Sequence, residues 1–457
     1  MLQLSVTLLS CLFARSVAIS LPFEARPRTL PLVDGSSKDS SNPFNFSHIS
    51  DIKAPIDLYV ASLIAGGPTF QVVLDTGSSD LWLDTASLKP SGTQDTGATA
   101  AVGYGDGTVA QGPILTANVT FGNFSVPQAF ISAPGSNATH NISTGLLGVG
   151  PPGLSVISVT NQTTPFNGKT LLENIFAANP DEPNSITFQL SRSETTGTTG
   201  GGTFTIGEVN ATLSGISSAP RLDVVSPNRW VVLMDGIIVN GKNVTGNSKH
   251  NVTGQGPTQT LANLDTGTSL ALIPKFYADA IYSGVPGAQF NPALNVYVVP
   301  CNTKIDLSFV FGGIAYPMHP VDTVQATQNP TAKGTVACFG GFQVSSGQDL
   351  DDDFLLGDSF LRNVYTLYDF GSFISGTTTP PFIQLLSTTN VSIADSEFAA
   401  LSAQRNASIT GTVPTSGGGG GGGSGTSSNG TSSAPQSIVW SMVPISAMGL
   451  GLGVALI

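Results

Sequence analysis

The sequence Leu-Asp-Thr-Gly-Ser-Ser at residues 74–79 recurs as Leu-Asp-Thr-Gly-Thr-Ser at residues 264–269. An apolar run precedes each copy, which predicts a buried strand that delivers Asp75 or Asp265 to a protected position. Two neighbouring carboxyl groups can share one proton, so that one takes a proton from water while the other gives one to a carbonyl oxygen. The repeat therefore predicts that Asp75 and Asp265 are a catalytic pair.

The residues that follow each aspartate are predicted to support it. In both copies the threonine can hydrogen-bond to the opposite loop, the glycine lets the chain turn tightly, and the next hydroxyl can donate to the outer carboxylate oxygen. These supporting residues are Thr76, Gly77, Ser78, Thr266, Gly267 and Thr268.

Further motifs follow the two aspartates in order. They are Trp82, Tyr-Gly-Asp-Gly-Thr at residues 104–108, Leu-Leu-Gly at 146–148, Leu-Leu-Gly-Asp-Ser-Phe-Leu-Arg at 355–362 and Tyr-Thr-Leu-Tyr-Asp at 365–369. From about Leu58 to Leu386, this ordered set closely resembles the pepsin-like aspartic proteases. The resemblance implies a mostly β, bilobal fold, in which two pseudo-symmetric β lobes enclose an active-site cleft. It also implies an aspartic endopeptidase that needs no cofactor.

The resemblance assigns a substrate-covering flap to residues 102–111. It implies that Tyr104 packs over the cleft with its hydroxyl toward Trp82, and that Gly105 and Asp106 bind the substrate backbone. A carboxylate at the flap tip could also pair with a basic side chain beside the cleaved bond. The expected partners are polypeptide substrates and pepstatin-type inhibitors, and the expected state is a monomer.

Other interpretations fit parts of this pattern. A third Asp-Thr-Gly, at residues 95–97, follows polar residues and precedes Ala98, so we interpret it as a surface turn. A catalytically silent binding protein would be expected to lose an aspartate or the flap tyrosine, and neither is lost. A glycosidase can use two carboxylates but does not require the repeated triplet. A structural cell-wall glycoprotein would not explain the paired aspartates.

Charged residues make up only 10% of the 457-residue chain, and the formal net charge is −12. Nucleic acid is therefore not an expected partner. With few carboxylates whose ion pairs protonation could break, an acidic milieu is the natural expectation. The acidic run at residues 349–353 is interpreted as a solvated loop, and no metal site is predicted.

Residues 1–20 are predicted to be a secretory signal peptide, because an apolar run from Leu2 to Phe13 precedes small residues suited to cleavage. Residues 21–50 form a short prosegment or N-terminal extension. This stretch has only three basic residues, at Arg26, Arg28 and Lys38, whereas the family resembled usually has a basic prosegment. Activation through a shorter segment and the absence of a latent zymogen both remain open.

The predicted lobes span residues 51–210, with Asp75 and the flap, and 211–386, with Asp265. A Ser/Thr/Gly-rich tether is predicted at residues 387–430, since it includes seven consecutive glycines at 417–423. Residues 431–457 resemble a glycosylphosphatidylinositol attachment signal, with a removed apolar tail. The candidate attachment residues are Ser428, Asn429 and Gly430. A tail-anchored membrane helix is the alternative.

Cys11 lies in the predicted signal peptide, which leaves Cys301 and Cys338 in the mature chain. Two thiols in an oxidising compartment are expected to pair, and their flanking residues resemble the second-lobe disulfide loop of the family.

Asn-X-Ser/Thr sequons fit a secretory route. They occur at Asn45, Asn118, Asn123, Asn137, Asn141, Asn161, Asn210, Asn243, Asn251, Asn390, Asn406 and Asn429. The layout of signal, protease lobes, tether and anchor resembles the fungal yapsin-type enzymes. A fungal cell surface, at the plasma membrane or cell wall, is the expected location.

Overall fold

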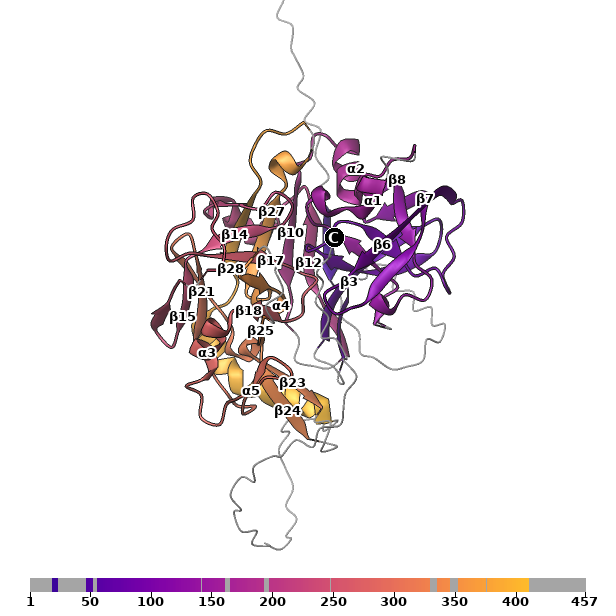
Figure 1. Ribbon diagram of the computed structural model, residues 1–457. Coiled ribbons are helices and arrows are strands. Elements are labelled where there is room, and N and C mark those ends of the chain that lie inside the picture. The colour runs from indigo at the N-terminus through magenta and orange to yellow at the C-terminus, as the bar shows by residue number, and fades with distance from the viewer. Residues whose placement is uncertain are drawn as a thin grey trace, which may run out of the picture.

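The protein is mostly β and has two lobes joined by a shared sheet (Figure 1). The computed structural model describes residues 19–23, 47–51, 56–140, 142–160, 165–192, 197–246, 248–328, 335–345, 352–374 and 376–410. The arrangement of sheets confirms the predicted mostly β, bilobal fold.

A six-stranded sheet connects the lobes, with three strands from each half of the chain. In spatial order these are β1 (Ile19–Phe23), β12 (Gly202–Ile206), β10 (Ser185–Leu190), β27 (Val364–Asp369), β28 (Phe382–Ser387) and β13 (Leu222–Asp223). The halves meet at the antiparallel pair β10–β27, where Phe188 faces Thr366. The connection after β12 passes through the 3-10 segment η4 (Ala211–Ser218), at the predicted lobe boundary.

The N-terminal lobe is built on a nine-stranded sheet. Its order is β11 (Gly197–Gly200), β2 (Ser47–Asp51), β3 (Ile56–Ala65), β4 (Thr69–Asp75), β9 (Gly145–Gly148), β5 (Leu81–Leu83), β8 (Phe124–Ser132), β7 (Val109–Phe121) and β6 (Gln94–Gly103). Strand β3 also pairs with β7, so the sheet folds back on itself. The short helices are η1 (Asn137–Thr139), η2 (Pro152–Leu154), α1 (Val156–Thr160) and α2 (Leu171–Ala178).

Helix α2 illustrates how local sequence defines an element. Thr170 and Glu173 form a capping box, in which the Thr170 hydroxyl accepts from the Glu173 amide and the Glu173 carboxylate accepts from the Thr170 amide. Leu172, Ile175 and Phe176 are buried on its inner face.

Three smaller sheets form the C-terminal lobe. The first contains β14 (Val231–Met234), β17 (Thr260–Leu264), β26 (Phe354–Leu356), β18 (Ala271–Ile273) and β25 (Phe342–Val344). The second contains β16 (Lys242–Val244), β15 (Gly236–Val239), β21 (Leu307–Phe311) and β22 (Ile314–Pro317). The third contains β19 (Gln289–Asn291), β20 (Val296–Val298), β24 (Val336–Gly340) and β23 (Val324–Gln328). The helices are α3 (Lys275–Tyr282), η5 (Pro320–Thr323), α4 (Asp358–Leu361), η6 (Gly371–Phe373) and α5 (Val391–Thr410).

The two lobes deliver their aspartates in the same way. Strand β4 ends at Asp75 and pairs in parallel with β9, whereas β17 ends just before Asp265 and pairs in parallel with β26. Both β9 and β26 carry a Leu-Leu pair, and each also pairs antiparallel with the strand that follows the aspartate loop. The repeated motifs therefore mark one supersecondary unit, used twice.

A disulfide joins Cys301 to Cys338, which confirms the predicted pairing. The Cα atoms are 5.1 Å apart, and the bridge closes 37 residues of sequence separation. By chain entropy such a loop contributes about 4 kcal/mol.

Helix α5 shows that part of the predicted tether was assigned wrongly. Residues 391–410 form a helix that packs against the C-terminal lobe instead of a flexible chain. The remaining part of the predicted tether, residues 411–430, lies outside the described residues. Its inner face is Ala394, Phe398, Ser402, Arg405 and Ile409, all of which are buried. These positions recur with helical spacing, but most of them are small or polar residues. The sequence therefore lacks the apolar periodicity from which a helix is usually predicted.

Two strands run across other predicted boundaries, and neither tests the predicted signal cleavage. Strand β2 crosses the predicted junction at residues 50 and 51, because it pairs with both β3 and β11 in the lobe sheet. Strand β1 crosses the predicted signal cleavage region and pairs with β12. The rest of the predicted signal and prosegment, and the predicted attachment signal, lie outside the described residues.

The acidic run is the remaining correction, because Asp352 and Asp353 are buried rather than solvated. The Asp353 carboxylate accepts hydrogen bonds from the Ser248 hydroxyl and from the amides of Lys249 and Leu261. Asp353 therefore holds the loop at residues 248–249 against strand β17 of the C-terminal lobe.

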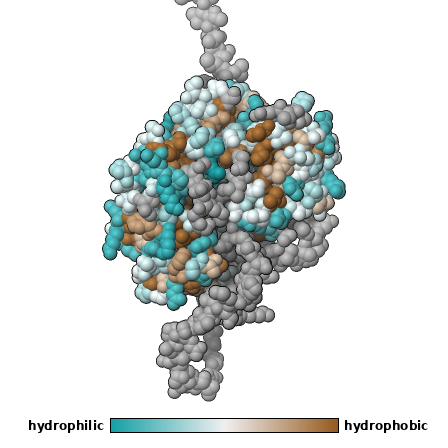
Figure 2. Space-filling model, viewed as in Figure 1, coloured by the Kyte–Doolittle hydropathy of each residue, from teal (hydrophilic) through white to brown (hydrophobic). Residues whose placement is uncertain are grey.

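On the face shown in Figure 2, hydrophobic residues lie in separate small patches on both lobes. Within the described ranges, no helix combines the length and apolar character needed to cross a membrane.

Candidate active site

Asp75 and Asp265 lie together at the junction of the lobes, as predicted. Asp75 is 1% exposed and Asp265 is fully buried. The loops that carry them are joined by reciprocal hydrogen bonds: the Thr76 amide donates to Thr266 Oγ1 (3.1 Å), and the Thr266 amide donates to Thr76 Oγ1 (3.0 Å). The same hydroxyls donate to the carbonyls of Leu264 (2.9 Å) and Leu74 (2.8 Å). The predicted cross-loop role of both threonines is confirmed.

Each carboxylate is held at both oxygens. The Gly77 amide donates to Asp75 Oδ1 (2.7 Å), and the Ser78 hydroxyl donates to Asp75 Oδ2. In the other lobe, the Gly267 amide and the Thr268 hydroxyl donate to Asp265 Oδ1 and Oδ2, both at 2.8 Å. The two aspartates thus have matching orientations, fixed by local donors.

Glycine is required beside each aspartate because the opposite carboxyl passes directly over it. A Cβ on Gly77 would lie 2.8 Å from the Asp265 carboxyl carbon, and one on Gly267 would lie 2.3 Å from Asp75 Oδ1. These contacts also show how closely the two acids approach.

Burial raises the pKa of Asp75 well above its ordinary value, and the nearby charge of Asp265 raises it further. Burial also raises the pKa of Asp265, although the hydrogen bond from Asp75 and those from Gly267 and Thr268 oppose that effect. The pair therefore holds a proton where isolated carboxyls would both be ionised, and this shared proton belongs to the pair as a unit.

The predicted flap is the hairpin of β6 and β7. At its turn the Tyr104 amide donates to the Thr108 carbonyl (3.0 Å), and the Gly107 amide donates to the Tyr104 carbonyl (2.9 Å). The Trp82 indole donates to the Tyr104 hydroxyl (2.6 Å), so the predicted contact is confirmed. Gly105 lies in the same turn.

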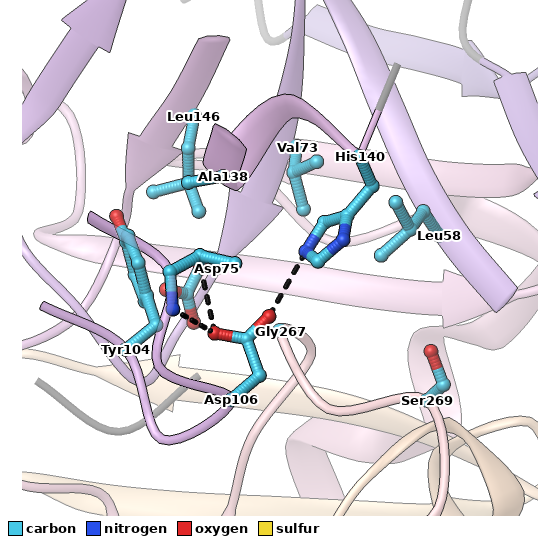
Figure 3. Close-up of a pocket in the computed structure, with 11 residues that line it drawn as sticks. Leu58, Val73, Asp75, Tyr104, Asp106, Ala138, His140, Leu146, Gly267 and Ser269 are labelled. Carbon is cyan, nitrogen blue, oxygen red and sulfur yellow. Dashed lines mark hydrogen bonds and ion pairs between the residues drawn. The ribbon is translucent and has the colours of Figure 1, made fainter. Parts of the chain in front are cut away.

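A pocket lies between the flap and Asp75 (Figure 3). Leu58, Val73, Ala138 and Leu146 give it an apolar wall. Its polar lining consists of Asp75, Tyr104, Asp106, Thr108, His140, Gly267 and Ser269.

His140 was not found by sequence reasoning. It caps η1, and its Nε2 atom lies 3.2 Å from Asp106 Oδ2. Burial acts to raise the pKa of Asp106, but hydrogen bonds from His140 and Thr108 outweigh it and lower that pKa. His140 lies 34 positions after Asp106, and no sequence motif links the two residues. Their contact is visible only in the folded structure.

Asp80 was also missed. It is 5% exposed, and its carboxylate accepts from the Ser155 hydroxyl (2.6 Å) and from the amides of Val156 (2.7 Å) and Ile157 (3.2 Å). Asp80 therefore fixes the start of α1 behind the catalytic loop. The sequence signal for Asp80 was its position directly after the first motif, next to Ser79.

The third Asp-Thr-Gly does not reach the site. Asp95 is exposed on β6, where its carboxylate accepts from the Gly97 amide (2.8 Å) at an irregularity in the pairing with β7. The interpretation as a surface turn is thus close to the observed bulge.

The described residues contain no group of three or more His, Cys, Asp or Glu side chains placed to hold a metal ion. Sequons Asn118, Asn123, Asn137, Asn243, Asn251 and Asn390 are exposed, whereas Asn210 and Asn406 are half-buried. Asn45, Asn141, Asn161 and Asn429, together with Ser428 and Gly430, lie outside the described residues.

Comparisons with known proteins agree with this geometry. A family model described as eukaryotic aspartyl protease matches residues 58–377. An aspartic protease of Phaffia rhodozyma is 27% identical over 340 residues, which cover 69% of this chain and 74% of the relative. Endothiapepsin of Cryphonectria parasitica is 28% identical over 348 residues, covering 71% and 74%. A probable aspartic-type endopeptidase CTSD of Arthroderma benhamiae is 28% identical over 368 residues, covering 76% of this chain and 63% of the relative.

Proposed function

Because the chain belongs to the eukaryotic aspartyl protease family, we propose that it cleaves polypeptides with a water molecule activated between Asp75 and Asp265. The observation that carries this proposal is the reciprocal Thr76–Thr266 hydrogen bonding, which brings two buried carboxyls into contact. One carboxyl then serves as acid while the other serves as base.

In the first step, protonated Asp75 donates its proton to the carbonyl oxygen of the scissile bond, and ionised Asp265 takes a proton from water. The water oxygen bonds to the carbonyl carbon and gives a gem-diol. In the second step, Asp265 returns its proton to the amide nitrogen, the carbon–nitrogen bond breaks, and Asp75 takes a proton from one hydroxyl of the gem-diol. The products are an acid and an amine, and no acyl-enzyme forms.

The flap is proposed to close over the bound peptide and exclude bulk water. The Trp82–Tyr104 hydrogen bond holds the tyrosine on the pocket side of the hairpin, which supports that role. Pepstatin-type inhibitors would occupy the same cleft.

We propose an acidic working range, because only a singly protonated pair can act. As the pH rises, the loss of the shared proton removes the acid, and at very low pH protonation of both groups removes the base. The raised pKa values of the pair extend activity upward from the ordinary carboxyl range.

The working location is proposed to be the fungal cell surface, reached by secretion and held through a lipid anchor. The exposed sequon asparagines and the Cys301–Cys338 disulfide are compatible with that route. The protease unit is proposed to act as a monomer.

The test is cleavage of a quenched peptide library from pH 3 to pH 7 by the secreted protein, with Asp75→Asn and Asp265→Asn variants in parallel. Loss of cleavage in both variants, and inhibition of the wild type by pepstatin, are expected. Asp95→Asn is the matched control, because it alters the exposed third triplet. A folded wild type without activity would overturn the proposal and favour a binding protein.

A further inference from the structure

The flap-tip carboxylate is fully engaged within the protein. Asp106 Oδ1 accepts from the Thr108 amide (2.9 Å) and from the Thr108 hydroxyl (2.7 Å). Its Oδ2 atom faces His140 Nε2 at 3.2 Å, and the Asp106 side chain is only 2% exposed. The sequence led us to expect that Asp106 pairs with a basic side chain of the substrate. In the structure its carboxylate already pairs with His140 and Thr108.

His140 is held in place by the same hairpin that carries Asp106. The Ser136 hydroxyl donates to the Val109 carbonyl (2.9 Å), and the Val109 amide donates to Asn137 Oδ1 (3.0 Å). These bonds fix η1 against the base of the flap turn. The backbone of His140 then takes a left-handed conformation, with φ 48°, and ends η1 with its ring toward Asp106 (Figure 3).

The surroundings favour an uncharged occupant. The pocket beside Asp75 has an apolar wall, formed by Leu58, Val73, Ala138 and Leu146. A lysine or arginine entering it would lose water and would need to displace His140 to reach the Asp106 carboxylate. An unpaired Asp106 would instead offer such a side chain a buried counter-charge.

We propose that His140 is a specificity-determining positioning residue. By pairing with Asp106, it withholds the flap carboxylate from the substrate, so the pocket beside Asp75 selects apolar side chains and rejects lysine and arginine. This inference rests on the proposed peptidase function and assigns the substrate class of the same site.

The test compares peptides that are identical except for norleucine or lysine at one residue beside the scissile bond, placed on either side in turn. The wild type is expected to favour norleucine by about tenfold or more in kcat/KM. His140→Leu removes the partner of Asp106, so the lysine-to-norleucine ratio should rise by about tenfold, mainly through KM. Using the ratio separates specificity from any general loss of activity.

Two further variants assign the gain to the Asp106 carboxylate. Adding Asp106→Asn to His140→Leu should abolish the gain, and His140→Gln, which can still donate one hydrogen bond, should give a smaller one. His250→Leu makes the same change at a histidine that does not line the pocket and should leave the ratio unaltered. An unchanged ratio in His140→Leu, or equal cleavage of both peptides by the wild type, would overturn the inference.

Binding measurements keep this inference separate from the proposed function. Dissociation constants of the same peptides for the Asp75→Asn variant, with and without His140→Leu, should show the same change in ratio. No cleavage of any peptide by the wild type would count against the peptidase function, whereas an unchanged binding ratio would count against the role of His140.

Discussion

The hydroxyls of Thr76 and Thr266 each do two things, since each donates to a carbonyl of the opposite loop and accepts from the opposite amide. All four bonds are buried, so water cannot replace a missing partner. These side chains therefore set the spacing between the two loops that carry the carboxyls.

Replacing Thr266 with valine should lower the free energy of unfolding by about 2–3 kcal/mol, because the Thr76 amide and the Leu74 carbonyl lose their partners. kcat should fall as well, since the two aspartates lose their alignment. Denaturant unfolding and steady-state kinetics measure both effects. Thr266→Ser keeps the hydroxyl and is the control; equal stability of the serine and valine variants would contradict this account.

Asp352 should make the fold more stable in acid. Burial raises its pKa to about 7, even though Arg229 acts to lower it. Between about pH 4 and pH 7 the unfolded carboxyl has lost its proton while the native one retains it, so the free energy of unfolding falls as the pH rises. Asp352→Asn should remove this loss, which is on the order of 2–4 kcal/mol.

The measurement is urea unfolding at pH 4, 5.5 and 7, with the exposed Asp306→Asn as control. An equally steep pH dependence in Asp352→Asn and in the wild type would rule out this role.

At the scale of elements, α5 extends the C-terminal lobe beyond its last strand. Arg405 donates to the carbonyls of Val321 (3.0 Å) and Val324 (2.7 Å), and Lys304 pairs with Asp395 at 2.8 Å. The helix therefore satisfies backbone groups around η5 and β23 that would otherwise need another donor.

Arg405→Met keeps the length of the apolar stem but leaves the two carbonyls without that donor. We expect a loss of about 2–3 kcal/mol in the free energy of unfolding. Gln404→Ala, which alters an exposed neighbour on the same helix, is the control and should change stability little. The prediction fails if the two variants unfold at the same denaturant concentration.

The same elements show why sequence reasoning succeeded or failed. Asp75, Asp265 and the flap were predictable because their roles demand particular residue types at short spacing. Helix α5 was not, since its buried face includes Ser402 and Arg405, which composition assigns to solvent. Asp106 and His140 come together because the chain between them, through β7, β8 and η1, leads back to the flap. No local sequence pattern predicts this long-range contact.

At the scale of the whole molecule, an ion-pair network joins the two halves of the chain. Arg192, which follows β10, donates to Asp322 Oδ2 (2.5 and 3.0 Å), while Arg362 donates to Asp322 Oδ1 (3.1 Å). Burial acts to raise the pKa of Asp322, but the two arginines outweigh it and hold that pKa below its ordinary value.

Asp322→Asn should therefore cost about 3–5 kcal/mol, because it leaves arginine charge uncompensated at a buried position. The stabilisation from a lowered carboxyl pKa is present above the unfolded value and is lost as the pH falls through the folded value, so the variant should differ most at neutral pH. Unfolding measured at pH 3 and pH 7 tests this, with the exposed Asp181→Asn as reference. A uniform small effect at both pH values would contradict it.

The six-stranded sheet has a consequence for how the protein could be divided. A break within η4 would give two fragments, each with one catalytic aspartate and three strands of that sheet. Each fragment would present β10 or β27 as an unpaired edge whose natural complement is the other fragment. Proteolytic activity from separately produced halves would then report their reassembly, which would make this chain a two-part reporter of proximity.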